Sequence, residues 1–189
     1  MITGSPIIDN LTIQDFKNEF TRGFNYVDNW DSTKTYNIGN GVFYTNNKFY
    51  QCLNNTVTSV PTTISDWMQL NDNSLVSDQD ITSAFNKAKP AIDIGNFTDD
   101  NIRIGFLYLA AHYLSIEINF SGGLLQSQGL INSRAAGGVS EGLTIPDWML
   151  KSIIYSNFTR TFYGNEYLQM IYAMIQSNKY NVLYGRTLP

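Results

Sequence analysis

Residues that could perform acid–base or metal chemistry are few and scattered along the chain. His112 is the sole histidine, and it lies in an apolar stretch that is more typical of a core residue than of a general base or a ligand. The carboxylates Asp78 and Asp80 stand where a helix is expected to begin. The same holds for Asp99 and Asp100, so helix capping accounts for both pairs. We expect no catalytic residue and no metal.

Nucleotide and disulfide chemistry lack support in the sequence as well. The glycines between Ser121 and Gly142 follow an expected helix rather than a strand, and no Gly-Lys-Ser/Thr ending completes a phosphate loop. Cys52 is the single cysteine, so neither an intrachain disulfide nor a cysteine cluster for zinc is possible. We therefore expect no cofactor and no enzymatic activity.

Composition and charge restrict the partners. Charged residues make up 15% of the chain, below the usual share of about 25%, which suits a surface packed against neighbours. The net charge of −4 provides no overall basic footprint for phosphate backbones, although a weakly negative wall can line a passage through which DNA moves. No apolar run approaches the length of a membrane helix, and the first ten residues do not resemble a signal peptide. We expect assembly in the cytoplasm and no membrane contact.

Apolar spacing predicts five helices. They run approximately from Thr12 to Phe20, from Ser77 or Asp78 to Ala91, from Asn101 to Phe120, from Pro146 to Phe158 and from Gly164 to Ser177. Thr12 is the expected N-cap of the first, and Pro90 is expected to end or bend the second. The third is almost continuously apolar, so it should be buried on most sides.

Two segments interrupt this helical pattern. Between Trp30 and Leu70, aromatic and β-branched residues in short runs, separated by Gly39-Asn40-Gly41 and Asn46-Asn47, predict a small antiparallel sheet. The segment from Ser121 to Ile145 is rich in glycine and serine, and its Val139, Leu143 and Ile145 alternate as in a strand. A loop of this length is either functional or merely mobile.

The fold class expected from these patterns is α+β. A small helical bundle with a long loop or β-hairpin would comprise residues 1–28 and 72–189, and a small antiparallel β unit over 29–71 would be inserted into it.

The helical part resembles the head-to-tail connector, or adaptor, family of tailed phages. The resemblance rests on the order and spacing of Leu107–Leu114, Ser133–Ser140 and Thr161–Leu168, together with the first helix. It implies a structural virion protein of the neck, whose copies form a ring, dodecameric as in relatives, between the portal protein and the tail or a second connector protein. Such a ring retains DNA and lets it pass without specific binding.

The same resemblance implies two contact sites. The long loop would face the channel or the next subunit, with Arg134, Gly137, Gly138, Val139 and Glu141 as candidate residues. The stretch after the last helix, from Asn178 to Pro189, would be an arm that docks on the portal, with Tyr180, Leu183, Tyr184 and Arg186 as candidates.

The inserted unit resembles the small chitin- and cellulose-binding modules of bacterial hydrolases. The pattern is carried by Trp30, Tyr36, Gly39, Val42, Tyr44, Lys48, Tyr50, Pro61 and Trp67. Leu53-Asn54-Asn55 replaces the exposed tryptophan that such modules use to stack on sugars. We expect Trp30 and Trp67 to form its core and Tyr36, Tyr44 and Tyr50 to supply the exposed rings. The expected partner is capsid or fibre protein, and a carbohydrate-binding adhesin or hydrolase accessory domain is the alternative.

Overall fold

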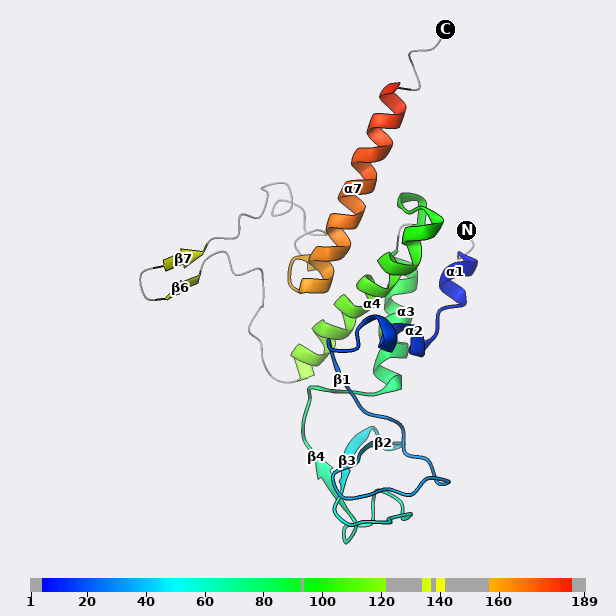
Figure 1. The fold of residues 1–189 in the computed structure, drawn as a ribbon, viewed down its shortest axis with the longest axis vertical. Coiled ribbons are helices and arrows are strands. Elements are labelled where there is room, and N and C mark those ends of the chain that lie inside the picture. Colours follow the sequence, from blue (N-terminus) through cyan, green and yellow to red (C-terminus); the bar gives the residue numbers. More distant parts are fainter. Residues whose placement is uncertain (1–4, 93, 122–133, 137–138, 142–156, 185–189) are drawn as a thin grey trace.

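The protein is an elongated α+β molecule in which a helical body stands above a small sheet (Figure 1). This computed structural model describes residues 5–92, 94–121, 134–136, 139–141 and 157–184. The helices α1 (Pro6–Asp9), α2 (Ile13–Glu19), α3 (Asp78–Ala91) and α4 (Asp99–Ser121) form the body together with the first turns of α7 (Phe162–Tyr184). A 3₁₀ turn, η1 (Ile94–Asn96), joins α3 to α4.

Local sequence signals set the starts of the helices. The Thr12 hydroxyl accepts a hydrogen bond from the backbone N–H of Asp15, whose carboxylate accepts one in return from the N–H of Thr12. Ser77 and Asp80 form the same reciprocal pair at the start of α3. Two otherwise unpaired N–H groups are thereby satisfied at each helix. The predicted N-cap Thr12 is confirmed, and Ser77 rather than Asp78 caps α3.

Helix α4 lies at the centre of the body and packs against α1, α3 and α7. Its buried residues are spread around most of the helix, as the sequence predicted: Ile102, Phe106, Leu107, Leu109, Ala110, Ala111 and Leu114. Phe16 and Phe85 extend this core from α2 and α3, and the ring of Phe85 meets that of Phe106 edge to face at 5.1 Å. Burying these apolar surfaces is the main favourable contribution to the stability of the body.

The inserted segment forms a three-stranded antiparallel sheet in the order β2 (Gly41–Tyr44), β3 (Lys48–Cys52) and β4 (Trp67–Leu70). Asn47 adopts a positive φ of 61° in the turn between β2 and β3, a conformation that asparagine tolerates better than most residues. The alternation of the strands buries one face, and its residues form a second hydrophobic cluster: Tyr36, Val42, Tyr50, Cys52, Val57 and Trp67. This cluster is separate from that of the helical body.

Two short parallel strands connect the sheet to the body. β1 (Asn25–Tyr26) leads into the insertion and pairs with β5 (Leu75–Val76), which leads out of it. The ends of the insertion are therefore adjacent, which is the requirement for placing a unit between two helices without disturbing their packing. The paired strands lie at residues 25–26 and 75–76, and the division at residues 29–71 stays a prediction.

Substitution of Phe106 by alanine should lower the free energy of unfolding by about 3–5 kcal/mol, because it leaves a cavity in the centre of the body. Phe162→Ala is the matched control, since this ring is 67% exposed, and its effect should stay within about 0.5 kcal/mol. Urea denaturation measures both. Equal losses for the two variants would contradict the placement of α4 at the centre.

Candidate interaction surfaces

The predicted long loop contains a β-hairpin that stands apart from the helices (Figure 1). β6 (Arg134–Ala136) pairs antiparallel with β7 (Val139–Glu141), and Arg134 lies directly across from Glu141 in the register. Two of the candidate contact residues, with opposite charges, are thus cross-strand neighbours. Val139 opens β7, whereas Gly137, Gly138, Leu143 and Ile145 lie outside the described residues. Ser121 belongs to α4 rather than to the loop.

The predicted end of the last helix is wrong. Helix α7 does not stop at Ser177 but continues to Tyr184, and in Figure 1 it extends past the other helices of the body. The segment Asn178–Tyr184 contains neither glycine nor proline, so nothing in it interrupts a helix before Gly185. Tyr180, Leu183 and Tyr184 are therefore helical residues, not part of an extended arm. Arg186 lies outside the described residues.

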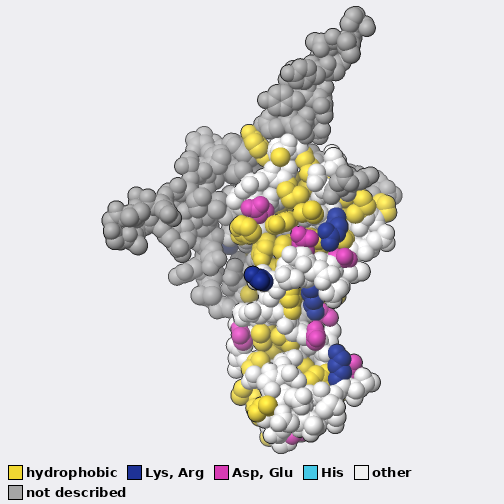
Figure 2. Space-filling model, in the orientation of Figure 1, with side chains coloured by type: hydrophobic (Ala, Val, Ile, Leu, Met, Phe, Trp, Pro, Cys, Tyr) yellow, Lys and Arg dark blue, Asp and Glu magenta, His cyan; other side chains and the backbone are white. Residues whose placement is uncertain are grey.

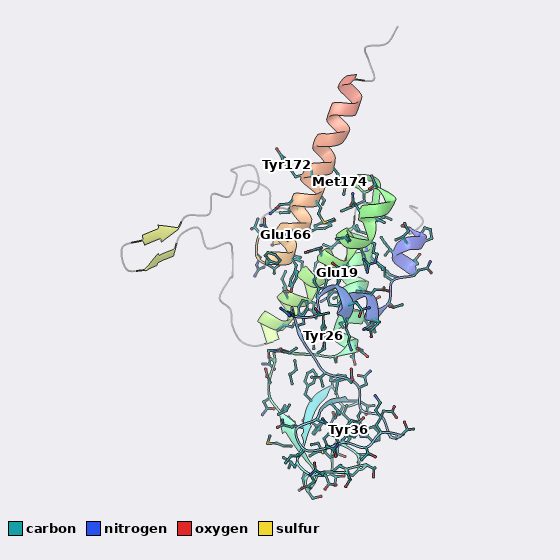
Figure 3. The ribbon with its side chains drawn as sticks, viewed as in Figure 1. Glu19, Tyr26, Tyr36, Glu166, Tyr172 and Met174 are labelled. Atoms are coloured by element: carbon teal, nitrogen blue, oxygen red, sulfur yellow. The ribbon has the colours of Figure 1, made fainter. Side chains whose placement is uncertain are left out.

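The expectation of exposed aromatic rings on the inserted unit is wrong for Tyr36 and Tyr50, which are each only 7% exposed. Tyr50 shares the buried face of the sheet with Val42, its partner in the register. The ring of Tyr36, labelled in Figure 3, meets Trp67 edge to face at 5.3 Å. Neither tyrosine presents a flat face on which a sugar could stack.

Trp30 and Tyr44 occupy a position between core and surface. Both are half-buried and pack against the sheet cluster, with their rings edge to face at 5.5 Å. The tryptophan core predicted for this unit is therefore confirmed for Trp67 and only partly for Trp30. Both rings line a hollow of about 270 Å³ that Gln79 of α3 also borders.

Aliphatic residues, which sequence reasoning did not single out, supply the exposed apolar surface of the inserted unit. They are Ile38, Leu53, Val60, Ile64 and Met68, and Ile64 is 90% exposed. Leu53 N–H donates to the carbonyl of Asp66, and Asp66 N–H donates to the carbonyl of Thr63, which closes the turn carrying Ile64. Leu53 stands where the exposed tryptophan of the sugar-binding modules was expected. We call this group the aliphatic surface.

Polar side chains of the inserted unit form hydrogen bonds with other residues of the same unit. The carboxylate of Asp66 accepts hydrogen bonds from Ser59 Oγ at 2.6 Å and from Asn54 Nδ2 at 3.2 Å. The bond from Ser59 holds the pKa of Asp66 below its ordinary value. Lys48 Nζ donates to Gln69 at 3.0 Å. The remaining outward surface is mostly uncharged, as the white lower part of Figure 2 shows.

His112 is buried at the contact between α4 and α7. Its Nδ1 lies 2.7 Å from Thr161 Oγ1, which also accepts a hydrogen bond from the N–H of Gly164 in the first turn of α7. Burial, aided by the nearby positive charge of Arg160, lowers the pKa of His112 to about 4. A Cβ at Gly164 would collide with His112 and with the carbonyl oxygen of Phe158, so glycine permits this close approach. The histidine thus links the two helices.

The carboxylates considered for chemistry lie at helix starts. Asp78 and Asp80 occupy the first turn of α3, and Asp99 and Asp100 begin α4. Within the described part of the chain, no three histidine, cysteine or acidic side chains gather closely enough to hold a metal ion. Over the same residues, no helix combines the length and apolarity needed to cross a membrane.

No family model, no curated protein and no solved structure matches the chain.

The burial of neutral His112 should make stability depend on pH. Because its pKa falls from 6.5 to about 4 on folding, the unfolded chain binds the proton more readily. The contribution of neutral His112 to the free energy of unfolding is fully present above pH 6.5 and decreases as the pH falls from 6.5 to about 4. The total loss is about 3 kcal/mol. Urea denaturation across this range measures it. His112→Gln should flatten this part of the profile, and an unchanged slope in that variant would contradict the assignment.

Proposed function

We propose that this chain is a structural subunit of a tailed-phage particle, a head-to-tail connector whose copies form a ring between portal and tail. The observation that carries the proposal is the pair of extensions that leave the helical body. The β6–β7 hairpin stands to one side, and α7 continues past the other helices (Figure 1). A subunit that must bind neighbours on different sides needs such extensions in addition to a stable body.

In a ring, each subunit uses one surface to bind the next and a different surface to bind the previous one. The hairpin suits one of these contacts, because Arg134 and Glu141 present opposite charges on adjacent strands of a projecting element. The far end of α7, with Tyr180, Leu183 and Tyr184, is the proposed contact with the portal. A helix can serve as the terminal arm that the resemblance implies.

The proposal includes a passage for DNA without specific binding, and no enzymatic activity. The net charge of −4 suits a channel that does not retain the strand. The polar residues that first invited a catalytic reading have structural roles: His112 bonds to Thr161, and Asp80 completes the capping of α3. These roles are compatible with a structural protein, and the proposed location is the neck of the virion, with assembly in the host cytoplasm.

The inserted unit would be an outward contact for a neighbouring virion protein, in capsid, tail or fibre. Its exposed apolar residues are aliphatic, whereas stacking on a sugar ring needs a flat aromatic face. Contact with a protein partner would bury these side chains, which is favourable. The half-buried Trp30 and Tyr44 beside their hollow are the observation that keeps a carbohydrate-binding adhesin as the second candidate.

Native mass spectrometry of the full chain tests the ring. We expect a closed oligomer, a dodecamer if the resemblance holds. Arg134→Glu should weaken it by reversing a charge on the hairpin, while circular dichroism stays unchanged. Lys34→Glu makes the same charge change on the exposed surface of the inserted unit and should leave the oligomer intact. If the protein is a monomer at every concentration, the ring is refuted. If Arg134→Glu leaves the oligomer unchanged, the hairpin does not contribute to the contact between subunits.

Sedimentation with insoluble chitin and cellulose separates the two roles of the inserted unit. We expect the protein to remain in solution, because the rings of Tyr36, Tyr50 and Trp67 are buried. Retention that disappears in Tyr44→Ala, with the fold intact, would establish the adhesin instead. Ile64→Ala is the control for that variant, since it removes an exposed apolar side chain of the inserted unit that is not aromatic.

A further inference from the structure

A polar cluster around Lys17 lies where the inserted unit meets the helical body. Lys17 Nζ is 2.8 Å from Asp78 Oδ1 and 3.5 Å from Asp28 Oδ1. Asn29 Nδ2 donates to the second oxygen of Asp78 at 3.4 Å. One ammonium group therefore contacts Asp78 in the first turn of α3 and Asp28, which follows β1 by two residues. Helices α2 and α3 belong to the body, whereas Asp28 and Asn29 lie where the chain enters the inserted unit.

Because this cluster is partly buried, losing one of its charges should cost more free energy than losing a charge from an ion pair on the surface. The side chains of Lys17 and Asp78 are 17% and 31% exposed, whereas that of Asp28 is 77% exposed, so the partly buried pair is Lys17 with Asp78. Burial alone would lower the pKa of Lys17, but the contacts with Asp78 and Asp28 outweigh it, and the pKa is raised. Asp78 Oδ1 is fully buried, and within the described residues the ammonium of Lys17 is the group that compensates it. Removing one partner of such a pair is costly, because the other charge stays buried.

Apolar packing contributes little to the angle between the two parts. Their hydrophobic clusters are separate, and hollows of about 270 Å³ and 150 Å³ lie where the unit faces α3 and α4. The backbone link is the β1–β5 pair, which has two residues in each strand. Tyr26 of β1, labelled in Figure 3, lies between body and unit, and its ring centroid is 5.6 Å from Lys17 Nζ.

We infer that Lys17, together with Asp78, fixes the direction in which the inserted unit points, by tying Asp28 and Asn29 at its entrance to helices α2 and α3. The unit is therefore held at one angle to the body rather than carried on a flexible tether. The inference is independent of the proposed function, since it concerns the junction and not the partner that the unit meets.

Distances between two spin labels, measured by pulsed electron paramagnetic resonance, test the inference on the full chain. One label is attached at Ser32→Cys in the unit and the other at Asn86→Cys in α3, both at exposed positions, in a Cys52→Ser background. Lys17→Met keeps the aliphatic stem and removes the charge. We expect its distance distribution to broaden and its centre to shift. Lys89→Met is the matched control, because Lys89 pairs with Asp9 inside the body at 3.2 Å, and its distribution should equal that of the parent.

A Lys17→Met distribution that superimposes on that of the parent, with the helices folded by circular dichroism, would overturn the inference. If Lys17→Met does not fold, the double variant Lys17→Met with Asp78→Asn takes its place, since it leaves no unpaired buried charge. Broadening in the double variant supports the inference, and an unchanged distribution refutes it.

Discussion

The burial of helix α4 is the constraint on which the rest of the body depends. A helix with Phe106, Leu109 and Leu114 all fully buried cannot rest on a single partner, because its apolar residues point in several directions. It must be covered by α3 on one side, α7 on another and the N-terminal helices elsewhere. His112 is the polar exception within this helix, and Thr161 satisfies it at the contact with α7. Ion pairs such as Lys87 with Glu117 lie at the edge of this packing and add little to stability.

The inserted unit obeys a different constraint, because so small a sheet can cover only one of its faces. Tyr50, Cys52 and Trp67 fill that face and leave little apolar surface for joining the unit to the body. The junction is consequently made of hydrogen bonds and charges: Asn25 with Ser74, and Lys17 with Asp28 and Asp78. Polar contacts are directional, so a junction of this kind sets an angle more readily than apolar packing does.

Local signals in the sequence were sufficient for most elements and insufficient for the contacts between them. The caps at Thr12 and Ser77 and the apolar run after Asn101 predicted three helices with nearly the right bounds. The end of α7 was misjudged because the apolar spacing weakens after Ser177 while the backbone meets no helix breaker. Lys17 and Asp78 are far apart in the sequence, and no periodic pattern connects them.

The error over the tyrosines has a different origin. The resemblance to sugar-binding modules suggested which residue types belong to the unit but not which face each one occupies. The register of β2 and β3 decides that question: Tyr50 lies opposite Val42, and both point into the cluster. Leu53, three residues beyond Tyr50 in the chain, then falls on the other face, which is exposed. The hairpin turn between β2 and β3 and the alternation of buried residues set this register, and neither was used to assign the tyrosines to a face.

The distribution of exposed apolar side chains follows from these constraints. Five of the seven large ones described lie on the inserted unit and two, Phe162 and Tyr172, on α7. The label of Tyr172 in Figure 3 marks a side chain directed away from the other helices. The body between these regions carries several ion pairs, among them Arg103 with Glu19 and Lys89 with Asp9. Contacts driven by apolar burial are therefore available at the inserted unit and along α7, while the charged surface of the body between them favours contact with water.

A rigid junction at Lys17 would keep these two regions at a constant separation. The proposed ring requires such a constant separation, because every copy of the subunit must meet its neighbours in the same way.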